Sequence, residues 1–587
     1  MSTKQKIWIF TFEFAGVMKV GGLGEVPANQ AKHLAESYDI TVFMPAHGQI
    51  EKISQKERIE KLPISYRGEI NSDKFGLEES NEIFDISFFK YEKENISIIL
   101  ISGNNSFTSK FLDDPTVYNP DTIKGKVGFF SLGMKFLVDH FLHKYPELLP
   151  NIIHLHDYHV VFPYFSIKQL MENHDIFIPS IITIHLLTYP RIEKKFYKAW
   201  GIDDTPIRVK LEGGIKFLDL DDIFDLTKET DEIPTVEKVG AVVCDLVTTV
   251  SQSYLISDII PNCGKELIRF KSDFIWDGCD WDYDELYSNV INKHGKEVRE
   301  FLDLQDDVSL TKENLKKYLL EYKLGNLSES PLIRSPKVLK EINEISNGNP
   351  FVRNGRIKAF QDSGLLVLTT GRISPQKGFE IILETIQDII KIIPDAKFLF
   401  LILPTEYSLK EIKTYSAFVK KFPDNIRIIF GVASDIFFLA HIASDVYCAL
   451  SRWEPFGIMA LEAMASKVPV IATNVGGLQE TILDIRMHPK NGTGILINKD
   501  NRKEFVDALI SLLIAAKIAY LSKNDQNLNE FNTYIDLIPD ENIKSFVKND
   551  SSFYFKMREN CLQRVKFNFT WEKVTQKLIK IYQKLIG

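Results

Sequence analysis

Three loops in the sequence combine glycine with positive charge or with a helix start, which suits them to binding phosphate. In the first, Lys19 precedes Gly21 and Gly22, and a helical pattern follows. Glycine lets backbone amides approach an oxygen-rich group, while a helix N-terminus and a lysine both add positive charge. The loop lacks the GxGxxG spacing of dinucleotide-binding folds, which argues against an NAD or FAD enzyme. The alternative is a tight strand-to-helix turn with a solvated lysine.

The other two loops lie in the second half of the chain. Arg372 and Lys377 share the sequence GRISPQKG, where the planar arginine fork and the lysine point charge suit a diphosphate. Gly476 and Gly477 precede another helical pattern and offer a further cluster of backbone amides. Charged loops are usually only solvated surface, but the proline and the second glycine of GRISPQKG indicate a shaped turn. We therefore predict that this loop binds a ligand.

Two glutamates, Glu454 and Glu462, lie eight residues apart in the segment between these loops. If one helix covers both, a turn of about 100° per residue places them nearly on one face. Two carboxylates in one crevice accept hydrogen bonds from sugar hydroxyls. The alternative for Glu462 is an ordinary surface residue.

Histidine and aspartate mark the ends of two predicted strands in the first half of the chain. HLHDYH spans residues 154–159, and the sequence TIH ends at His185. These residue types are common metal ligands, but alternate residues of a strand point to opposite faces, so we expect no metal site. A neutral His185 suits a hydrogen bond to a sugar hydroxyl or carbonyl. For His154, a satisfied core histidine stays an alternative.

Short apolar runs with helical patterns between them are the elements that position these residues. Continuous apolarity is typical of parallel strands covered on both faces by helices, so we predict two doubly wound α/β domains. The expected strands are residues 7–12, 40–43, 96–102, 152–154, 180–184 and 246–250, then 365–370, 398–403, 426–430, 446–450, 468–473 and 494–498.

Composition shifts divide the chain further. We predict an N-terminal domain over residues 1–282 and a helical or loop-rich insertion over 283–360. A C-terminal domain follows over 361–564, interrupted by a polar stretch near 521–552, and residues 565–587 form a closing amphipathic helix.

The net charge of −8 and the pI of about 5.9 lack the basic excess that favours nucleic-acid binding. The five cysteines are scattered without metal-ligand spacing, which predicts buried thiols in a reducing compartment. The longest apolar run near the C-terminus, residues 508–516, falls short of the roughly 20 residues that span a bilayer. We therefore predict a cytoplasmic protein that binds neither nucleic acid nor membrane.

In their order along the chain, these motifs resemble the bacterial and archaeal glycogen synthases and the starch synthases, a family of retaining glycosyltransferases. The resemblance runs from KVGGLGEVPA at residues 19–28 through HLHDYH, TIH, GRISPQKG and EPFG to VGGLQET and the C-terminal FTW segment. It implies the α/β GT-B fold, with two Rossmann-like doubly wound domains and an interdomain cleft. It also implies transfer of glucose, with retention, from ADP-glucose or UDP-glucose to the non-reducing end of an α-1,4-glucan, without a cofactor.

Where positions match, the resemblance implies roles for individual residues in binding the donor's phosphates. Lys19, Gly21 and Gly22 would contact the phosphates and the sugar of the donor. Arg372 and Lys377 would bind its diphosphate.

The remaining implied roles concern the sugars and the rest of the nucleotide. Glu454 would bind the transferred glucose, and His185 its 6-hydroxyl and the anomeric region. Asp157 would lie near the acceptor. Gly476–Gly477 would lie near the distal phosphate, and Glu462 would hold the ribose.

Several positions depart from the family's usual pattern. Leu186 follows His185 where many members have Asn, HDYH replaces HDWH, and Phe456 stands where many bacterial synthases have Cys. Asp277, in WDGCD, stands where NGVD is common, and we keep it among the substrate-binding residues. These departures bear on donor choice and acceptor contact rather than on the reaction class.

For the mechanism, the resemblance implies front-face attack, in which the departing phosphate oxygen takes the acceptor's proton and preorganised charge stabilises the diphosphate. A related GT-B enzyme acting on a small sugar acceptor, of the trehalose or sucrose type, stays an alternative. So does a non-enzymatic carbohydrate-binding protein. A homo-oligomer also stays open.

Overall fold

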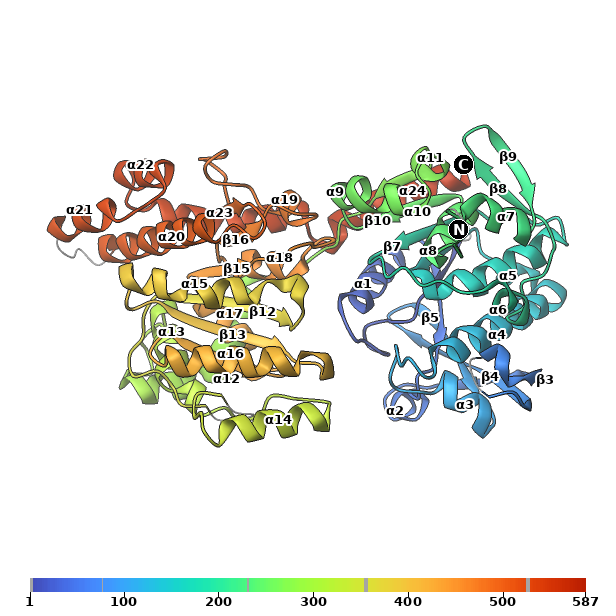
Figure 1. Ribbon diagram of the computed structural model, residues 1–587, viewed down its shortest axis with the longest axis horizontal. Helices are drawn as coiled ribbons and strands as arrows, with labels where there is room; N and C mark the ends of the chain where they lie inside the picture. The colour runs from blue at the N-terminus through green and yellow to red at the C-terminus, as the bar shows by residue number, and fades with distance from the viewer. Residues whose placement is uncertain (1–3, 76–77, 230–231, 353–356, 524–527) are drawn as a thin grey trace. The chain divides into compact units, whose positions relative to one another are not determined.

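The computed structural model describes residues 4–75, 78–229, 232–352, 357–523 and 528–587, and for 528–530 it describes the backbone alone (Figure 1). Residues 353–356 and 524–527, which fall within the two predicted polar segments, lie outside this set. The chain forms two compact units: the first comprises residues 1–278 and 571–587, and the second residues 279–570. Segment 283–360 thus lies in the second unit, and the last helix belongs to the first.

The first unit is built on a nine-stranded sheet in the order β11-β10-β7-β6-β1-β2-β5-β4-β3. Seven of these strands are parallel: β1 (Lys6–Phe10), β2 (Asp39–Pro45), β5 (Ile96–Gly103), β6 (Ile152–His156), β7 (Ser180–Ile184), β10 (Leu246–Thr249) and β11 (Ser272–Phe274). All six strands predicted for this half are confirmed.

β11 and the remaining strands of the first unit were not predicted, because their sequences do not read as continuous apolar runs. β3 (Glu60–Asn71) and β4 (Asn81–Lys93) extend one edge of the sheet as antiparallel strands. β8 (Ile207–Leu211) and β9 (Gly214–Leu218) form a separate hairpin. Along β3, exposed residues alternate with half-buried ones, which is the pattern of a strand with one face toward water.

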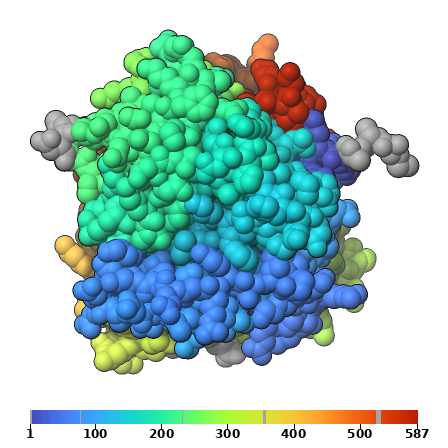
Figure 2. Space-filling model, turned by 90° about the vertical axis from the view of Figure 1, so that its right-hand side faces the viewer, coloured from blue at the N-terminus to red at the C-terminus, as the bar shows by residue number. Residues whose placement is uncertain are grey.

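Helices flank this sheet (Figure 1). They are α1 (Glu25–Leu34), α2 (Ile50–Ser54), α3 (Ser106–Leu112), α4 (Ile123–Lys144), α5 (Val161–Glu172), α6 (Lys194–Ala199), α7 (Leu220–Thr227), α8 (Val236–Val243), α9 (Gln252–Tyr254), α10 (Ile260–Cys263), α11 (Glu266–Arg269) and α24 (Trp571–Ile586). Figure 2 shows α24, in red, lying against the N-terminal segment, in dark blue.

The C-terminal helix α24 is part of the first unit's core. Its Leu578 and Tyr582 are buried with residues of β1, β2 and α1. At its start, a Cβ added to Gly278 would meet the ring of Trp571 at 2.7 Å, so glycine is needed where the two segments touch. The helix is therefore an integral element of that unit.

The second unit holds a six-stranded parallel sheet in the order β14-β13-β12-β15-β16-β17. Its strands are β12 (Leu366–Arg372), β13 (Lys397–Leu403), β14 (Ile426–Phe430), β15 (Val446–Ala449), β16 (Val470–Thr473) and β17 (Gly494–Ile497), as predicted. Its helices are α12 (Tyr283–Leu302), α13 (Lys312–Glu321), α14 (Pro336–Ser346), α15 (Phe379–Ile392), α16 (Leu409–Lys421), α17 (Phe437–Ala443), α18 (Ile458–Ala465), α19 (Leu478–Thr481), α20 (Arg502–Lys523), α21 (Leu528–Asp536), α22 (Glu541–Asn549) and α23 (Phe553–Asn568).

A buried ion pair fastens α13, which lies within the predicted insertion, to the sheet of the second unit. Asp445, directly before β15, lies 2.7 Å from Lys316 Nζ and 3.6 Å from Lys312 Nζ. Burial alone would raise the pKa of Asp445, but these two ammonium groups hold it at about 2. The first part of the insertion is thus fixed to the core by charge.

Helix α20 is long and apolar enough to cross a membrane, with a mean hydropathy of 1.8 over its most apolar window. However, 67% of that window is buried inside the second unit, where Leu509, Leu512 and Leu513 join the core. Such burial is what the core helix of a globular domain shows.

Candidate functional site

In the first unit, the loop after β1 is held by a buried glutamate. Glu13 is 2% exposed, and its Oε2 accepts the backbone N–H groups of Val20 at 2.5 Å and Gly21 at 3.0 Å. Its Oε1 accepts the hydroxyl of Tyr118 at 2.5 Å. Two of the loop amides are thus already directed at a carboxylate, so the loop presents a fixed shape.

The glycine and lysine of this loop lie on its outer side. A Cβ added to Gly21 would meet no atom within 4 Å, so the fold does not itself require glycine there. Lys19 is half-exposed and forms an ion pair with Glu25, the first residue of α1. The absence of a side chain at Gly21 leaves room for a group arriving from outside, while its N–H stays paired with Glu13.

At the ends of β6 and β7, two histidines and an aspartate lie together. His156 Nδ1 lies 2.9 Å from His185 Nε2, and the Oδ1 of Asp157 accepts the backbone N–H of His185 at 2.7 Å. Asp157 has a φ of 63°, a conformation that costs energy for a residue other than glycine. The structure therefore brings Asp157 and His185 together, as their positions at neighbouring strand ends predict.

Burial sets the protonation of this group. It lowers the pKa of His185 to about 3, so the imidazole is neutral at physiological pH. It raises the pKa of Asp157 to about 7, with Glu237 and Glu13 adding to the effect and the N–H groups of His185 and Leu186 opposing it.

His154 is a satisfied core histidine. Its Nδ1 lies 2.7 Å from the hydroxyl of Tyr582 on α24, and its Nε2 lies 2.7 Å from Thr183 Oγ1. Asp277, the other predicted substrate-binding residue of this unit, is buried beyond β11. Among the described residues, three side chains lie close enough together to hold a metal ion: Asp139, His143 and His174. None of them is a predicted site residue.

In the second unit, the loops after β12 and β15 meet in an ion pair. Lys377 Nζ lies 2.5 Å from Glu454 Oε2, which also accepts the hydroxyl of Ser451 at 2.8 Å. Glu454 is 9% exposed, and the Lys377 side chain is mostly buried. A cation and an anion at the carboxyl ends of adjacent parallel strands form a polar, partly desolvated centre where ligands of such sheets bind.

Arg452 braces these two loops. Its backbone N–H donates to Gln376 O at 2.7 Å, and its guanidinium donates to Pro375 O and pairs with Glu380 and Asp500. By contrast, Arg372 is exposed, and within the described ranges the structure records no hydrogen bond or ion pair for its guanidinium. Arg372 thus has its donors available to a ligand, while Arg452 is committed to structure.

Gly476 and Gly477 pack tightly on the segment that carries Glu454. A Cβ at Gly476, whose φ is 47°, would lie 1.8 Å from Glu454 O, and one at Gly477 would lie 2.3 Å from Phe456 Cα. The N–H of Gly477 donates to Glu454 O at 3.1 Å. These glycines therefore allow the close approach that positions Glu454.

Glu454 and Glu462 do not share a helix face. Helix α18 begins at Ile458, after Gly457 with a φ of 98°, so Glu454 lies in the preceding loop. The predicted placement of both glutamates on one helix face, which assumed a turn of about 100° per residue across both, is therefore wrong. Glu462 lies within α18 and is partly exposed.

Sequence reasoning missed Glu13, Tyr118 and Ser451. Glu13 lies just after β1, so it could have been predicted, as His185 was, from its position at the end of a strand. Tyr118 lies 105 residues from Glu13, and no local pattern in the sequence marks it.

Two family models match the chain. Residues 6–265 match the starch synthase catalytic domain, and residues 353–528 match glycosyl transferases group 1. The glycogen synthase of Thermosipho melanesiensis is 22% identical over 99% of both chains. The glycogen synthase of Chlamydia pneumoniae is 23% identical over 80% of this chain and 85% of its own.

A solved structure shares the fold. The catalytic domain of starch synthase IV from Arabidopsis thaliana, bound to ADP and acarbose, superposes with a TM-score of 0.63 at 17% identity, with complete coverage of both chains. Two Rossmann-like units together with this match define the GT-B fold. With the matched models and relatives, the chain belongs to the glycogen synthase and starch synthase family.

Proposed function

We propose that this glycogen or starch synthase transfers glucose, with retention of anomeric configuration, from ADP-glucose or UDP-glucose to the non-reducing end of an α-1,4-glucan. The observation that carries the proposal is the Lys377–Glu454 ion pair at 2.5 Å in a mostly buried setting. It joins a cation suited to the leaving diphosphate to a carboxylate suited to sugar hydroxyls.

Departure of the diphosphate leaves positive charge on the sugar and adds negative charge to the leaving group. Arg372, with unengaged donors, and Lys377, held in place by Glu454, stabilise that negative charge by preorganised electrostatics. Lys19, Gly21 and Gly22 serve the donor's phosphates in the first unit, where the space beside Gly21 allows close approach while its N–H stays paired with Glu13. In this proposal the leaving phosphate oxygen takes the acceptor's proton, so no protein nucleophile or cofactor is used.

The histidine and aspartate of the first unit act on the sugars. A neutral His185, fixed by His156, donates or accepts a hydrogen bond without placing a second positive charge beside the sugar. Asp157 faces the acceptor. Glu462 holds the ribose, and Gly476–Gly477 support Glu454 and approach the distal phosphate.

We also place the protein in the cytoplasm. All five cysteines are free and buried, which suits a reducing compartment.

The direct test is nucleoside diphosphate release from ADP-glucose and from UDP-glucose, each with and without glycogen or a maltooligosaccharide. Glucan-dependent release is expected, and the faster donor identifies the nucleotide. The ¹H NMR spectrum of the extended oligosaccharide should show a new α-anomeric signal, as retention requires. Release that depends on a monosaccharide acceptor instead, or none from either donor, would contradict the proposal.

A further inference from the structure

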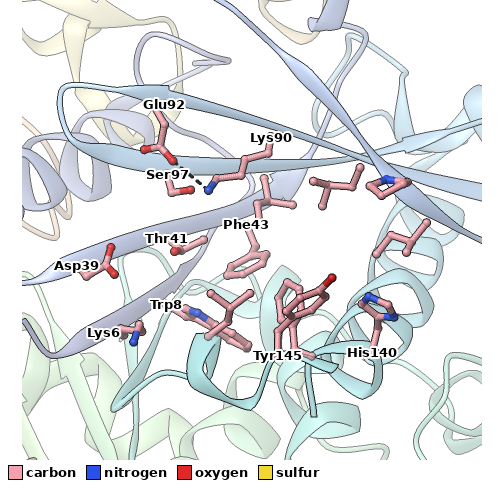
Figure 3. A pocket seen from close by; sticks show the side chains of 16 residues that line it. Lys6, Trp8, Asp39, Thr41, Phe43, Lys90, Glu92, Ser97, His140 and Tyr145 are labelled. Carbon is pink, nitrogen blue, oxygen red and sulfur yellow. Dashed lines mark ion pairs between the residues drawn. The ribbon is translucent and has the colours of Figure 1, made fainter. Parts of the chain in front are cut away.

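The first unit contains a pocket of about 360 Å³ that none of the proposed roles uses (Figure 3). Its floor includes the beginnings of three parallel strands: Lys6 and Trp8 of β1, Asp39 of β2, and Ser97 of β5. Glu13 and His185 lie beyond the opposite, carboxyl ends of the same sheet's strands. The pocket is therefore separate from the candidate site of this unit.

An irregularity in the sheet opens this pocket. β3 and β4 pair at Lys61↔Phe89 and next at Ser65↔Ser87, so four residue steps on β3 face two on β4. The unpaired residues of this bulge, 62–64, are an apolar trio that lines the pocket. Bulges of this kind re-aim side chains and recur beside binding sites.

Aromatic rings form much of the wall. Trp8 packs against Phe43 at 4.9 Å and Phe141 at 6.0 Å between ring centroids, and Tyr145 lies beside them on the same side of the opening (Figure 3). Phe43 and Phe141 are buried, whereas Tyr145 is 48% exposed. The rings are inclined to one another, at 62° for Trp8 and Phe43 and 59° for Trp8 and Phe141, and such an aromatic lining favours an apolar or aromatic ligand that packs against ring faces and edges.

Polar groups without a hydrogen-bond partner in the described ranges give the pocket selectivity. Trp8 is 2% exposed, and among the described residues its indole N–H has no acceptor. The hydroxyls of Thr41 and of the buried Ser97, which lie opposite each other on β2 and β5, likewise have no hydrogen bond in the described ranges. Each of these three groups can therefore form a hydrogen bond with a polar atom of a ligand that enters the pocket.

Charge at the rim is balanced. Lys6 and Asp39 lie at one end, and Lys90 pairs with Glu92 at 3.1 Å on the opposite wall (Figure 3). With two cations and two anions, the rim favours neither sign, so the best-matched ligand is uncharged.

We propose that this pocket binds a small, uncharged, planar aromatic molecule of one or two fused rings that carries a hydrogen-bond acceptor. The acceptor takes the N–H of Trp8, the rings lie against Phe43 and Tyr145, and Thr41 and Ser97 meet a second polar atom. The inference does not depend on the proposed function, because it uses none of the residues assigned to donor or acceptor.

Ligand-observed NMR titration of the full chain with quinoline and indole tests this. Quinoline has a ring nitrogen that accepts a hydrogen bond, whereas indole has a similar size and only donates. Both are expected to bind one-to-one, with dissociation constants of order 0.1–1 mM for ligands of this size. If neither quinoline nor indole binds at 5 mM, the proposal is overturned.

Two variants locate the site. Leu62→Trp fills the pocket from the bulge and is expected to abolish binding of both probes, whereas Tyr407→Trp, at a side chain 92% exposed in the second unit, should change nothing. Trp8→Phe removes only the donor and should weaken quinoline about tenfold while leaving indole within twofold. Melting curves establish that each variant is folded.

Three results would overturn the assignment: unchanged quinoline binding in folded Leu62→Trp, equal weakening of both probes in Trp8→Phe, or displacement of quinoline by maltotriose. The last would mean that the pocket takes a carbohydrate.

Discussion

The Lys377–Glu454 ion pair provides a test that separates stability from catalysis. Lys377→Met keeps the length of the side chain and removes the charge, which leaves Glu454 with the Ser451 hydroxyl as its remaining side-chain partner. Removing one member of a buried pair costs about 3–5 kcal/mol. Because Ser451 still satisfies part of the carboxylate, we expect about 2–4 kcal/mol, seen as a fall in melting temperature of about 5–10 °C.

Glu454→Gln in the same chain should reverse most of that loss. An amide needs no counter-ion, so the double variant Lys377→Met/Glu454→Gln should melt within about 2–3 °C of the wild type. Turnover should not recover, because the charge that stabilises the leaving diphosphate is absent. We expect Lys377→Met to lose about 10²–10³ in kcat, the effect of one preorganised donor, and the double variant to lose at least as much, because Glu454 is also assigned to the transferred glucose.

The assay is diphosphate release at saturating glucan, together with calorimetric melting of the same samples. Lys391→Met is the matched control, because Lys391 forms an exposed pair with Asp388 at 2.9 Å on α15. Such pairs contribute about 0–1 kcal/mol, so this variant should keep its activity and stability. Recovery of turnover along with stability in the double variant would refute the role assigned to Lys377.

Four other substitutions test the first unit. Gly21→Ala should leave the melting temperature unchanged, because no atom lies within 4 Å of the added Cβ, but should raise KM for the nucleotide sugar; unchanged kinetics would exclude close approach of the donor there. Glu13→Gln should lower kcat about tenfold or more by loosening the loop at Val20 and Gly21, whereas Tyr118→Phe, which removes one hydrogen bond to Glu13, should have a smaller effect; equal losses would contradict this order. Because the pKa of Asp157 is about 7 in the folded chain and near 4 when unfolded, its burial should make stability fall as pH rises from 4 to 7, and Asp157→Asn should flatten that slope in urea melts at several pH values; an unchanged slope would contradict the raised pKa.

Most of the parallel strands could be predicted because both of their faces are covered, so their sequences are largely apolar, whereas the short parallel strand β11, with the sequence SDF, was not predicted. β3 could not, since one of its faces meets water and its sequence, EKLPISYRGEIN, alternates in burial rather than running apolar. The pocket beside it was equally inaccessible, because it depends on a register break between β3 and β4 that no local pattern encodes.

For the candidate site, sequence order was enough to find residues at strand ends. Lys377 and Glu454 follow β12 and β15, which are neighbours in the sheet, and they do meet. The contacts that hold Glu454 in place could not be predicted from the sequence. Gly476 and Gly477 look like a phosphate loop in sequence, but their close contacts with Glu454 and Phe456 emerge only when the chain has folded.

The return of α24 to the first unit has a consequence for the order of folding. Tyr582 on this helix completes the hydrogen bonds of His154, more than 400 residues earlier. The two ends of the second unit's sequence, residues 279 and 570, lie together, because the N–H of Cys279 donates to Phe569 O at 2.7 Å. During synthesis, the second unit therefore has its whole sequence before the first does. The first unit therefore cannot complete its core during synthesis until α24 has left the ribosome, and until then the surface that α24 covers stays exposed.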